Sequence, residues 1–208
     1  MSTGPTIETW TSRNLTDAAV MNRRIRDVNT WLANPPAAKV HGKFVTYTNS
    51  SYGLLTFYAP GKETTTNTNR TAFQTVSGMV VVESDGVTVK ELKAPKAGRY
   101  RLTIGGAATA VTSSGGTPYD FWVYLGRNPE ADTGESVANN AVTSGAWTAA
   151  SNYTYLGTRT IDVTLAAGDR IRAAARMDGS DWKYADTSSS NSYQTTSFLE
   201  MRWIGEVP

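Results

Sequence analysis

The chain lacks cysteine altogether and has a single histidine, His41, among its 208 residues. Without cysteine it can form neither disulfide bonds nor thiolate metal sites, so its stability must come from packing. A zinc site would need several histidine or cysteine ligands, which the sequence does not supply. A serine hydrolase would need a histidine base, but His41 stands beside Gly42 and no Gly-x-Ser-x-Gly motif accompanies it. We therefore expect no enzyme of these kinds, no metal and no cofactor.

The chain also has little excess of either charge: the formal net charge is +2, and charged residues make up 18% of the chain. Nucleic acids and anionic membranes attract proteins with a concentrated positive field, so neither is an expected partner. No apolar run approaches the length of about 18 residues that a membrane-spanning helix needs, and the polar N-terminus shows no secretion signal. Gly61-Lys62 is followed by Glu63, which excludes a phosphate-binding loop. We expect a soluble protein made in a cytoplasm.

What the chain does have is 18 glycines, 10 tyrosines and many Thr, Ser and Asn residues, a composition that favours short strands joined by polar turns. After residue 36 the apolar residues alternate with polar ones. The expected strands are Lys43–Tyr47, Leu54–Tyr58, Thr71–Val76, Met79–Glu83, Val87–Leu92, Arg99–Ile104, Phe121–Leu125, Tyr153–Leu165, Arg170–Arg176 and Ser197–Ile204. Alternation places Tyr100, Leu102, Ile104, Ile161, Val163 and Leu165 on inward faces. About ten strands exceed one comfortable open sheet, so we expect an all-β sandwich of two antiparallel sheets.

One amphipathic helix precedes the strands, over residues 16–33. Thr16 provides an N-cap, and the Pro35-Pro36 pair ends the helix. Its apolar residues recur at spacings of three and four and form a narrow heptad stripe: Ala18, Met21, Ile25, Val28 and Leu32. Such a stripe favours helical partners, although it could also pack on the body of its own subunit. With the extended segment around Trp10, the helix forms an expected attachment region at 1–36, and the strands form a domain at 37–208.

Three polar segments should be exposed loops at the ends of the sandwich: Ser113–Pro118, Asn128–Asn140 and Asp178–Ser192. Five aromatic residues lie in or beside the expected loops and could stack on sugar rings: Trp147, Tyr153, Trp182, Tyr184 and Tyr193. The alternative is that these rings cover the edge of the core or lie in a subunit interface.

Acidic residues in the same loops raise two further alternatives. A glycosidase would need two carboxylates across a sugar, and the candidates are Glu130, Asp132, Glu135, Asp178, Asp181 and Asp186. The sequence does not place any two of them at the required separation. The Asp178–Asp181 segment also offers oxygen donors to calcium, but it does not match an EF-hand loop. We expect solvated acids without catalytic activity, and we leave calcium binding open.

Four motifs in order resemble the jelly roll of complement and tumour-necrosis-factor-like proteins. They are Pro95 with Gly98-Arg99-Tyr100, the segment Phe121–Asn128, the turn Leu165–Asp169, and the last strand around Ser197–Glu200. The resemblance covers residues 43–205. It implies a jelly-roll β-sandwich that forms a homotrimer through a flat, aromatic-rich sheet. Small residues in Arg172–Arg176 would then allow neighbouring subunits to approach closely.

The N-terminal segment Trp10–Asp27, followed by Trp31-Leu32 and Pro35-Pro36, resembles the opening of minor structural proteins of tailed phages that infect actinobacteria. There it precedes diverse C-terminal bodies, which implies a shared attachment module. The two resemblances together predict a non-enzymatic virion protein, a minor tail, tail-tip or fibre component. Its arm would bind other virion proteins, and its trimeric body would contact the host, with cell-envelope glycan as a candidate ligand. The alternatives are a capsid decoration or head-fibre protein and a glycan-degrading tail enzyme.

Overall fold

The computed structural model of the chain describes residues 35–62, 72–110, 119–149, 154–184 and 197–206. The predicted arm and helix lie outside this part of the chain. With them lie all six residues of the predicted attachment site, Trp10, Ala18, Met21, Ile25, Val28 and Leu32. The domain boundary after residue 36 and the helical stalk therefore stay predictions.

The described residues form fourteen strands and one short helix, α2 (Gly134–Asn139). The strands are β1 (Ala37–Gly42), β2 (Val45–Tyr47), β3 (Gly53–Leu54), β4 (Phe57–Tyr58), β5 (Phe73–Gln74), β6 (Val80–Val82), β7 (Thr88–Lys93), β8 (Gly98–Ala110), β9 (Tyr119–Arg127), β10 (Ala141–Ala149), β11 (Thr154–Leu165), β12 (Arg170–Asp178), β13 (Trp182–Tyr184) and β14 (Phe198–Gly205). Each strand pair in the described part of the chain is antiparallel.

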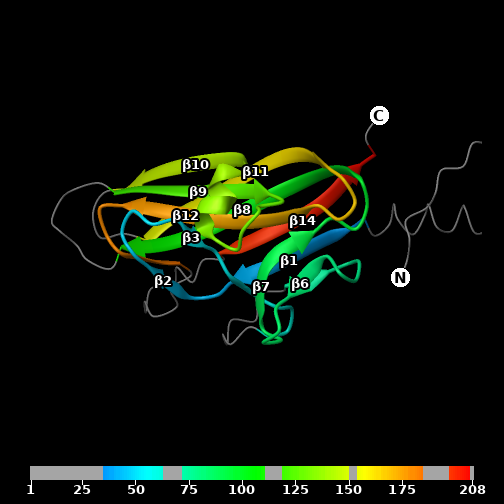
Figure 1. Ribbon diagram of the computed structural model, residues 1–208, viewed down its shortest axis with the longest axis horizontal. Coiled ribbons are helices and arrows are strands. Elements are labelled where there is room, and N and C mark those ends of the chain that lie inside the picture. Colours follow the sequence, from blue (N-terminus) through cyan, green and yellow to red (C-terminus); the bar gives the residue numbers. More distant parts are fainter. Residues whose placement is uncertain (1–34, 63–71, 111–118, 150–153, 185–196, 207–208) are drawn as a thin grey trace, which may run out of the picture.

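The long strands lie in two layers (Figure 1). In the first layer the neighbours are β11, β8, β14 and β1, and in the second they are β10, β9, β12 and β7. Strand β4 pairs with both β1 and β7, so the hydrogen-bonded sheet continues from one layer to the other. The predicted fold class is confirmed: the chain folds as a jelly-roll sandwich.

The hydrophobic core fills the space between the two layers. Tyr100, Leu102 and Ile104 of β8 are at most 1% exposed, which confirms the predicted alternation in this strand. In β11, Leu165 is buried, whereas Ile161 and Val163 are only half-buried. This strand pairs only with β8 among the described strands, so its inner face lies at the margin of the core.

Three strands lie where none is expected: β1, β10 and β13. Ala37 and Ala38 belong to β1, where they pair with Arg202 and Met201 and are buried. Strand β10, with the sequence AVTSGAWTA, is too rich in small residues to show a clear hydrophobic alternation. These pairings are long-range, and a short sequence window does not contain them.

Two further predictions need correction. The expected strand Leu54–Tyr58 is divided into β3, which pairs with β12, and β4, which pairs with β1 and β7, because the chain passes from one partner to another. The expected loop Asn128–Asn140 contains α2, whose N-cap residue Thr133 accepts a hydrogen bond from the Ser136 amide. The buried side chain of Val137 fixes this helix on the sheet.

Candidate functional site

The aromatic residues of the expected ligand-binding loops do not form a common site in the structure. Trp182 and Tyr184 belong to β13, which pairs with β8 and β2, and both side chains are 0% exposed. Trp182 stacks on Tyr47 with ring centroids 4.3 Å apart, and the Tyr184 hydroxyl donates to the Gly105 carbonyl. Burial raises the pKa of Tyr184. For these two residues the prediction of a ligand-binding loop is wrong, because pairing on both sides draws β13 into the core.

Of the other three rings, Trp147 lies in β10, opposite Phe121 of β9. Its side chain lies outside the described residues, as do Tyr153 and Tyr193.

The structure also corrects the expectation that the small residues of Arg172–Arg176 lie at a surface between subunits. Ala173, Ala174 and Ala175 are each 0% exposed within the single subunit, because β12 is flanked by β9 and β3.

The acidic residues considered for hydrolysis or calcium binding are dispersed. Asp132 pairs with Arg172, Asp178 pairs with Arg176, and Asp181 accepts a hydrogen bond from the Asn49 amide. Among the described residues, no group of three or more His, Asp or Glu side chains could hold a metal ion. Glu130 and Glu135 are exposed on the segment around α2, and Asp186 lies outside the described residues.

The strongest candidate site is a cluster of aromatic and charged side chains on the outer face of β9 and β12. Its members, which we call the aromatic platform, are Tyr52, Trp122, Tyr124, Arg176 and Asp178. Each is half-buried. Phe121, Val123 and Leu125 of β9 are in the core, so the alternation of the strand places Trp122 and Tyr124 outward. Rigid strands thus hold both rings at the surface.

The two rings of β9 have different cross-strand neighbours on their two sides. Tyr124 lies between Ala174 of β12 and Ser144 of β10. Trp122 has Ala146 of β10 on one side and Arg176 of β12 on the other. Ser144 and Ala146 are exposed, and Trp122 and Tyr124 are half-buried, so part of each ring is open to solvent on the side of β10.

Tyr52, which precedes β3, completes the platform. Its ring lies edge-on to that of Tyr124, with centroids 5.5 Å apart and an interplanar angle of 66°. The Arg176 guanidinium lies 5.3 Å from the centre of the Tyr52 ring, its Nη1 donates to the Tyr52 hydroxyl, and its Nε donates to Asp178 Oδ1 at 2.8 Å. Burial, followed by the neighbouring Tyr52, raises the pKa of Tyr124. The platform therefore combines flat apolar surfaces with a fixed ion pair.

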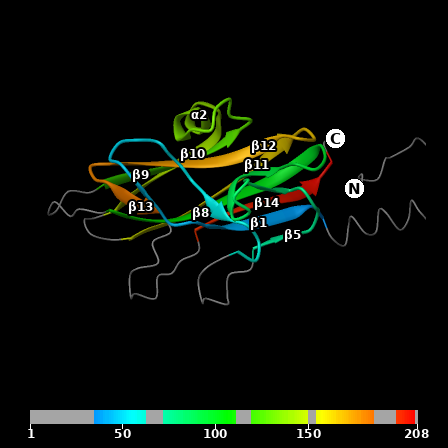
Figure 2. The same ribbon diagram turned by 60° about the horizontal axis from the view of Figure 1, so that its bottom comes forward.

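Helix α2 lies on the outer side of the layer that contains β9, β10 and β12 (Figure 2), and it contacts the segment that carries Tyr52. It approaches so closely that a Cβ atom on Gly134 would lie 2.5 Å from the Tyr52 carbonyl oxygen. A Cβ on Gly126 of β9 would lie 2.6 Å from the Val137 carbonyl oxygen. Only glycine allows these contacts, so α2 braces the backbone that carries Tyr52.

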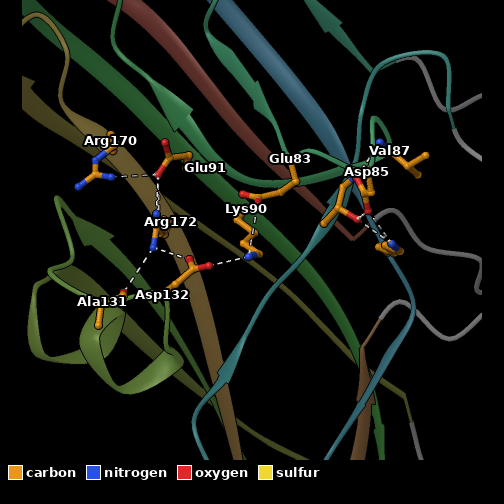
Figure 3. Close-up of polar contacts among 11 residues, drawn as sticks. Glu83, Asp85, Val87, Lys90, Glu91, Ala131, Asp132, Arg170 and Arg172 are labelled. Atoms are coloured by element: carbon orange, nitrogen blue, oxygen red, sulfur yellow. Dashed lines mark hydrogen bonds and ion pairs between the residues drawn. The ribbon is translucent and has the colours of Figure 1, made fainter.

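A charge network ties the segment before α2 to the sheet (Figure 3). It consists of Lys90, Glu91, Asp132 and Arg172. Arg172 donates from Nε to Glu91 Oε2 at 2.9 Å and from Nη1 to Asp132 Oδ1 at 2.6 Å, and Lys90 Nζ lies 2.5 Å from Asp132 Oδ2. The Arg172 and Glu91 side chains are 10% and 9% exposed. Because its charges are paired, the network positions α2 rather than offering a reactive group.

Sequence reasoning missed the platform, although part of its signal is local. The alternation Phe121-Trp122-Val123-Tyr124-Leu125 already separates two outward rings from three inward residues. Tyr52 carries no such signal. It meets Tyr124 only because the segment before β3 crosses the sheet beside β12.

Among the comparisons with known proteins, the one with solved structures finds a likeness in fold. Neither a protein-family model nor a curated protein matches the chain. Among solved structures, the chain is similar to "Structure of Eiger TNF from S. frugiperda", with 12% sequence identity, a TM-score of 0.46, and coverage of 83% of this chain and 94% of that chain. No helix in the described part of the chain is long and apolar enough to cross a membrane. The fold assignment therefore depends on the strand order itself.

Proposed function

We propose that this chain is a non-enzymatic structural protein of a bacteriophage virion, a minor tail, tail-tip or fibre component that projects a trimeric jelly roll to contact the host surface. The observation that carries the proposal is the aromatic platform, a surface of rings and paired charges held on rigid strands. The N-terminal resemblance to phage structural proteins supports the location in the virion. The heptad stripe of residues 18–32 supports trimer formation and attachment to other virion proteins.

The body has two distinct ends, which suits attachment at one and recognition at the other. The described chain begins beside its last strand, where the Trp203 amide donates to the Pro36 carbonyl at 2.7 Å. Strand β9 begins and β12 ends at the opposite end of the sandwich (Figure 1), where Asp178 lies opposite Asp120 in the strand register. Arg176 and Asp178 of the platform lie near that end. An arm joined at residue 35 would therefore place the Arg176 and Asp178 part of the platform toward the end distant from the particle.

The test uses purified full-length protein and the bacterium on which the phage grows. We expect labelled protein to bind the cells and to slow adsorption of intact virions, and we expect electron cryo-microscopy to locate it on the tail. Absence of cell binding, with density on the head, would instead assign the chain to capsid decoration. Release of reducing sugar from the host envelope would overturn the non-enzymatic proposal.

A further inference from the structure

We infer that the aromatic platform binds a neutral saccharide, with sugar rings stacked on Trp122 and Tyr124 and sugar hydroxyls hydrogen-bonded to Arg176 and Asp178. This inference rests on the proposed function and names the ligand class of the same site. It assigns the binding surface to strands rather than to the loops that sequence reasoning favoured.

The aromatic side chains supply the apolar half of such a site. A pyranose has faces of C–H groups, which pack on flat amphipathic rings. Trp122 and Tyr124 are half-buried, and their β10 neighbours Ser144 and Ala146 are exposed, so a ligand can reach the rings from the side of β10. Tyr52 stands at 66° to Tyr124 and forms a corner against which a sugar ring can rest.

The ion pair supplies the polar half. Arginine carries five N–H donors, and Arg176 uses Nε for Asp178 and Nη1 for Tyr52. In the described part of the chain, Nη2 of Arg176 makes no hydrogen bond. The Asp178 side chain is 44% exposed and presents acceptor oxygens to solvent. Donors and acceptors side by side match hydroxyl groups, each of which both donates and accepts.

The charges of the platform favour a neutral ligand over a charged one. An anionic polymer would meet the carboxylate of Asp178, which is partly open to solvent. A cationic ligand would meet Arg176, whose guanidinium already lies over the Tyr52 ring. A polyhydroxylated ligand without charge avoids both repulsions and uses both members of the ion pair.

The platform is also fixed before binding. Trp122, Tyr124, Arg176 and Asp178 lie on paired strands, and α2 abuts the backbone of Tyr52. Aromatic side chains have only two rotatable bonds, so they lose little conformational entropy when a ligand packs on them. Binding to such a surface requires little reorganisation, which favours affinity from a small contact area.

The experiment measures retardation of the full-length protein in native gels that contain one polysaccharide each. The probes are a neutral β-glucan, a neutral α-mannan and a neutral galactan, with polygalacturonate as the anionic comparison. We expect at least one neutral probe to retard the protein, and Trp122→Ala and Tyr124→Ala to weaken that affinity about tenfold or more. Tyr124→Phe keeps the ring and should bind within about twofold of the unchanged protein.

Phe44→Ala is the matched control, because Phe44 is a 43% exposed ring outside the platform. Arg176→Gln tests the polar half without removing a ring and should also lose affinity, with circular dichroism showing that each variant is folded. No retardation by any neutral probe, equal retardation by polygalacturonate, or undiminished binding by folded Trp122→Ala would overturn the inference. If cells are bound and Trp122→Ala changes nothing, the proposed function stands and this site fails. If a neutral probe is bound but cells are not, the site stands and the proposed function fails.

Discussion

At the scale of single residues, Arg172 ties the segment before α2 to the sheet. Its guanidinium bonds Glu91 on β7 and Asp132 before α2, and it is almost wholly buried. Removing one member of a buried pair leaves an uncompensated charge and costs about 3–5 kcal/mol. We expect Arg172→Met to lower the free energy of unfolding by that amount, measured by urea denaturation.

The matched control is Arg101→Met. Arg101 also forms an ion pair through Nε and Nη2, with Asp162, but its side chain is 54% exposed. Exposed pairs contribute about 0–1 kcal/mol, so this variant should be nearly as stable as the unchanged protein. Equal losses in the two variants would contradict the role assigned to the charge network. Adding Glu91→Met to Arg172→Met should recover stability, because the unpaired carboxylate is then removed.

Asp169 connects two of the motifs on which the family resemblance depends. It accepts hydrogen bonds from Asn128 Nδ2 at 2.7 Å and from the Ala166 amide at 2.8 Å, and Arg127 forms a salt bridge with it. Burial acts to raise the pKa of Asp169, but these hydrogen bonds and the charge of Arg127 together hold it below its ordinary value. The Asn128 turn and the Gly168-Asp169 turn, far apart in sequence, are therefore joined by one carboxylate.

This shift predicts a dependence of stability on pH. A carboxyl group with a lower pKa in the folded chain stabilises the fold above its unfolded pKa of about 3.9, and this contribution is lost as the pH falls through the folded pKa. We expect Asp169→Asn to have a lower free energy of unfolding than the unchanged protein at neutral pH. This gap in free energy should shrink below about pH 4. Urea denaturation over a pH series measures the gap, and Glu130→Gln controls for the loss of an exposed carboxylate nearby. A gap independent of pH would be inconsistent with this role of Asp169.

At the scale of elements, α2 is a helix of 6 residues and is stabilised by its cap and its contacts rather than by its length. The Thr133 side chain accepts a hydrogen bond from the Ser136 amide at 3.2 Å. Loss of an N-cap costs about 1 kcal/mol, so Thr133→Ala should lower the free energy of unfolding by that amount. Thr133→Ser keeps the hydroxyl and should have little effect in the same urea experiment. A loss of equal size in both variants would show that the hydroxyl does not cap the helix.

Strands with a strong alternation could be predicted from sequence, and strands defined by their partners could not. The segment from Arg99 revealed β8 because large apolar residues alternate with Arg and Thr. Strand β13 has only 3 residues and forms between β8 and β2, so it resembled a polar loop. The two-residue strands β3 and β4 are defined by hydrogen bonds to distant strands, which no local pattern contains.

The same limit explains why the candidate site was misplaced. Trp182 and Tyr184 lie among polar residues in the sequence, which predicts a loop, but pairing on both sides of β13 buries them. The alternation around Trp122 and Tyr124 predicts a strand, but it does not show which residues of other strands lie beside the two outward rings. Their partners Tyr52 and Arg176 come from segments more than 45 residues away on either side, so only the folded sheet reveals the platform.

At the scale of the whole molecule, the proposed function requires attachment and recognition at different ends of the jelly roll. The first described residues lie beside β14 at one end, and Arg176 and Asp178 lie toward the other. The proposed trimer would use the helical arm to gather three bodies, and three platforms on one particle would strengthen weak saccharide contacts through multivalency. A single platform needs only modest affinity in such an assembly.

The heptad stripe of the arm therefore predicts that the protein is a trimer. The helix expected over residues 16–33 is too short to stay helical alone in water, and burial of its stripe against two copies would stabilise it. We expect light scattering on the full-length protein to give three times the mass of one chain. Ile25→Asp with Val28→Asp places charges in the stripe and should give monomers, whereas Arg23→Asp with Arg24→Asp, off the stripe, should leave the trimer intact.

The strand signal in circular dichroism should be the same for both double variants, because the body has its own core between the two layers. A monomer that still binds a neutral polysaccharide, but adheres to cells far less than the trimer, would separate the contribution of the platform from that of multivalency. If the unchanged protein is monomeric at micromolar concentration, the arm is not a trimerising stalk. Its stripe would then pack on the jelly roll of its own subunit or on another virion protein, and recognition would depend on one platform.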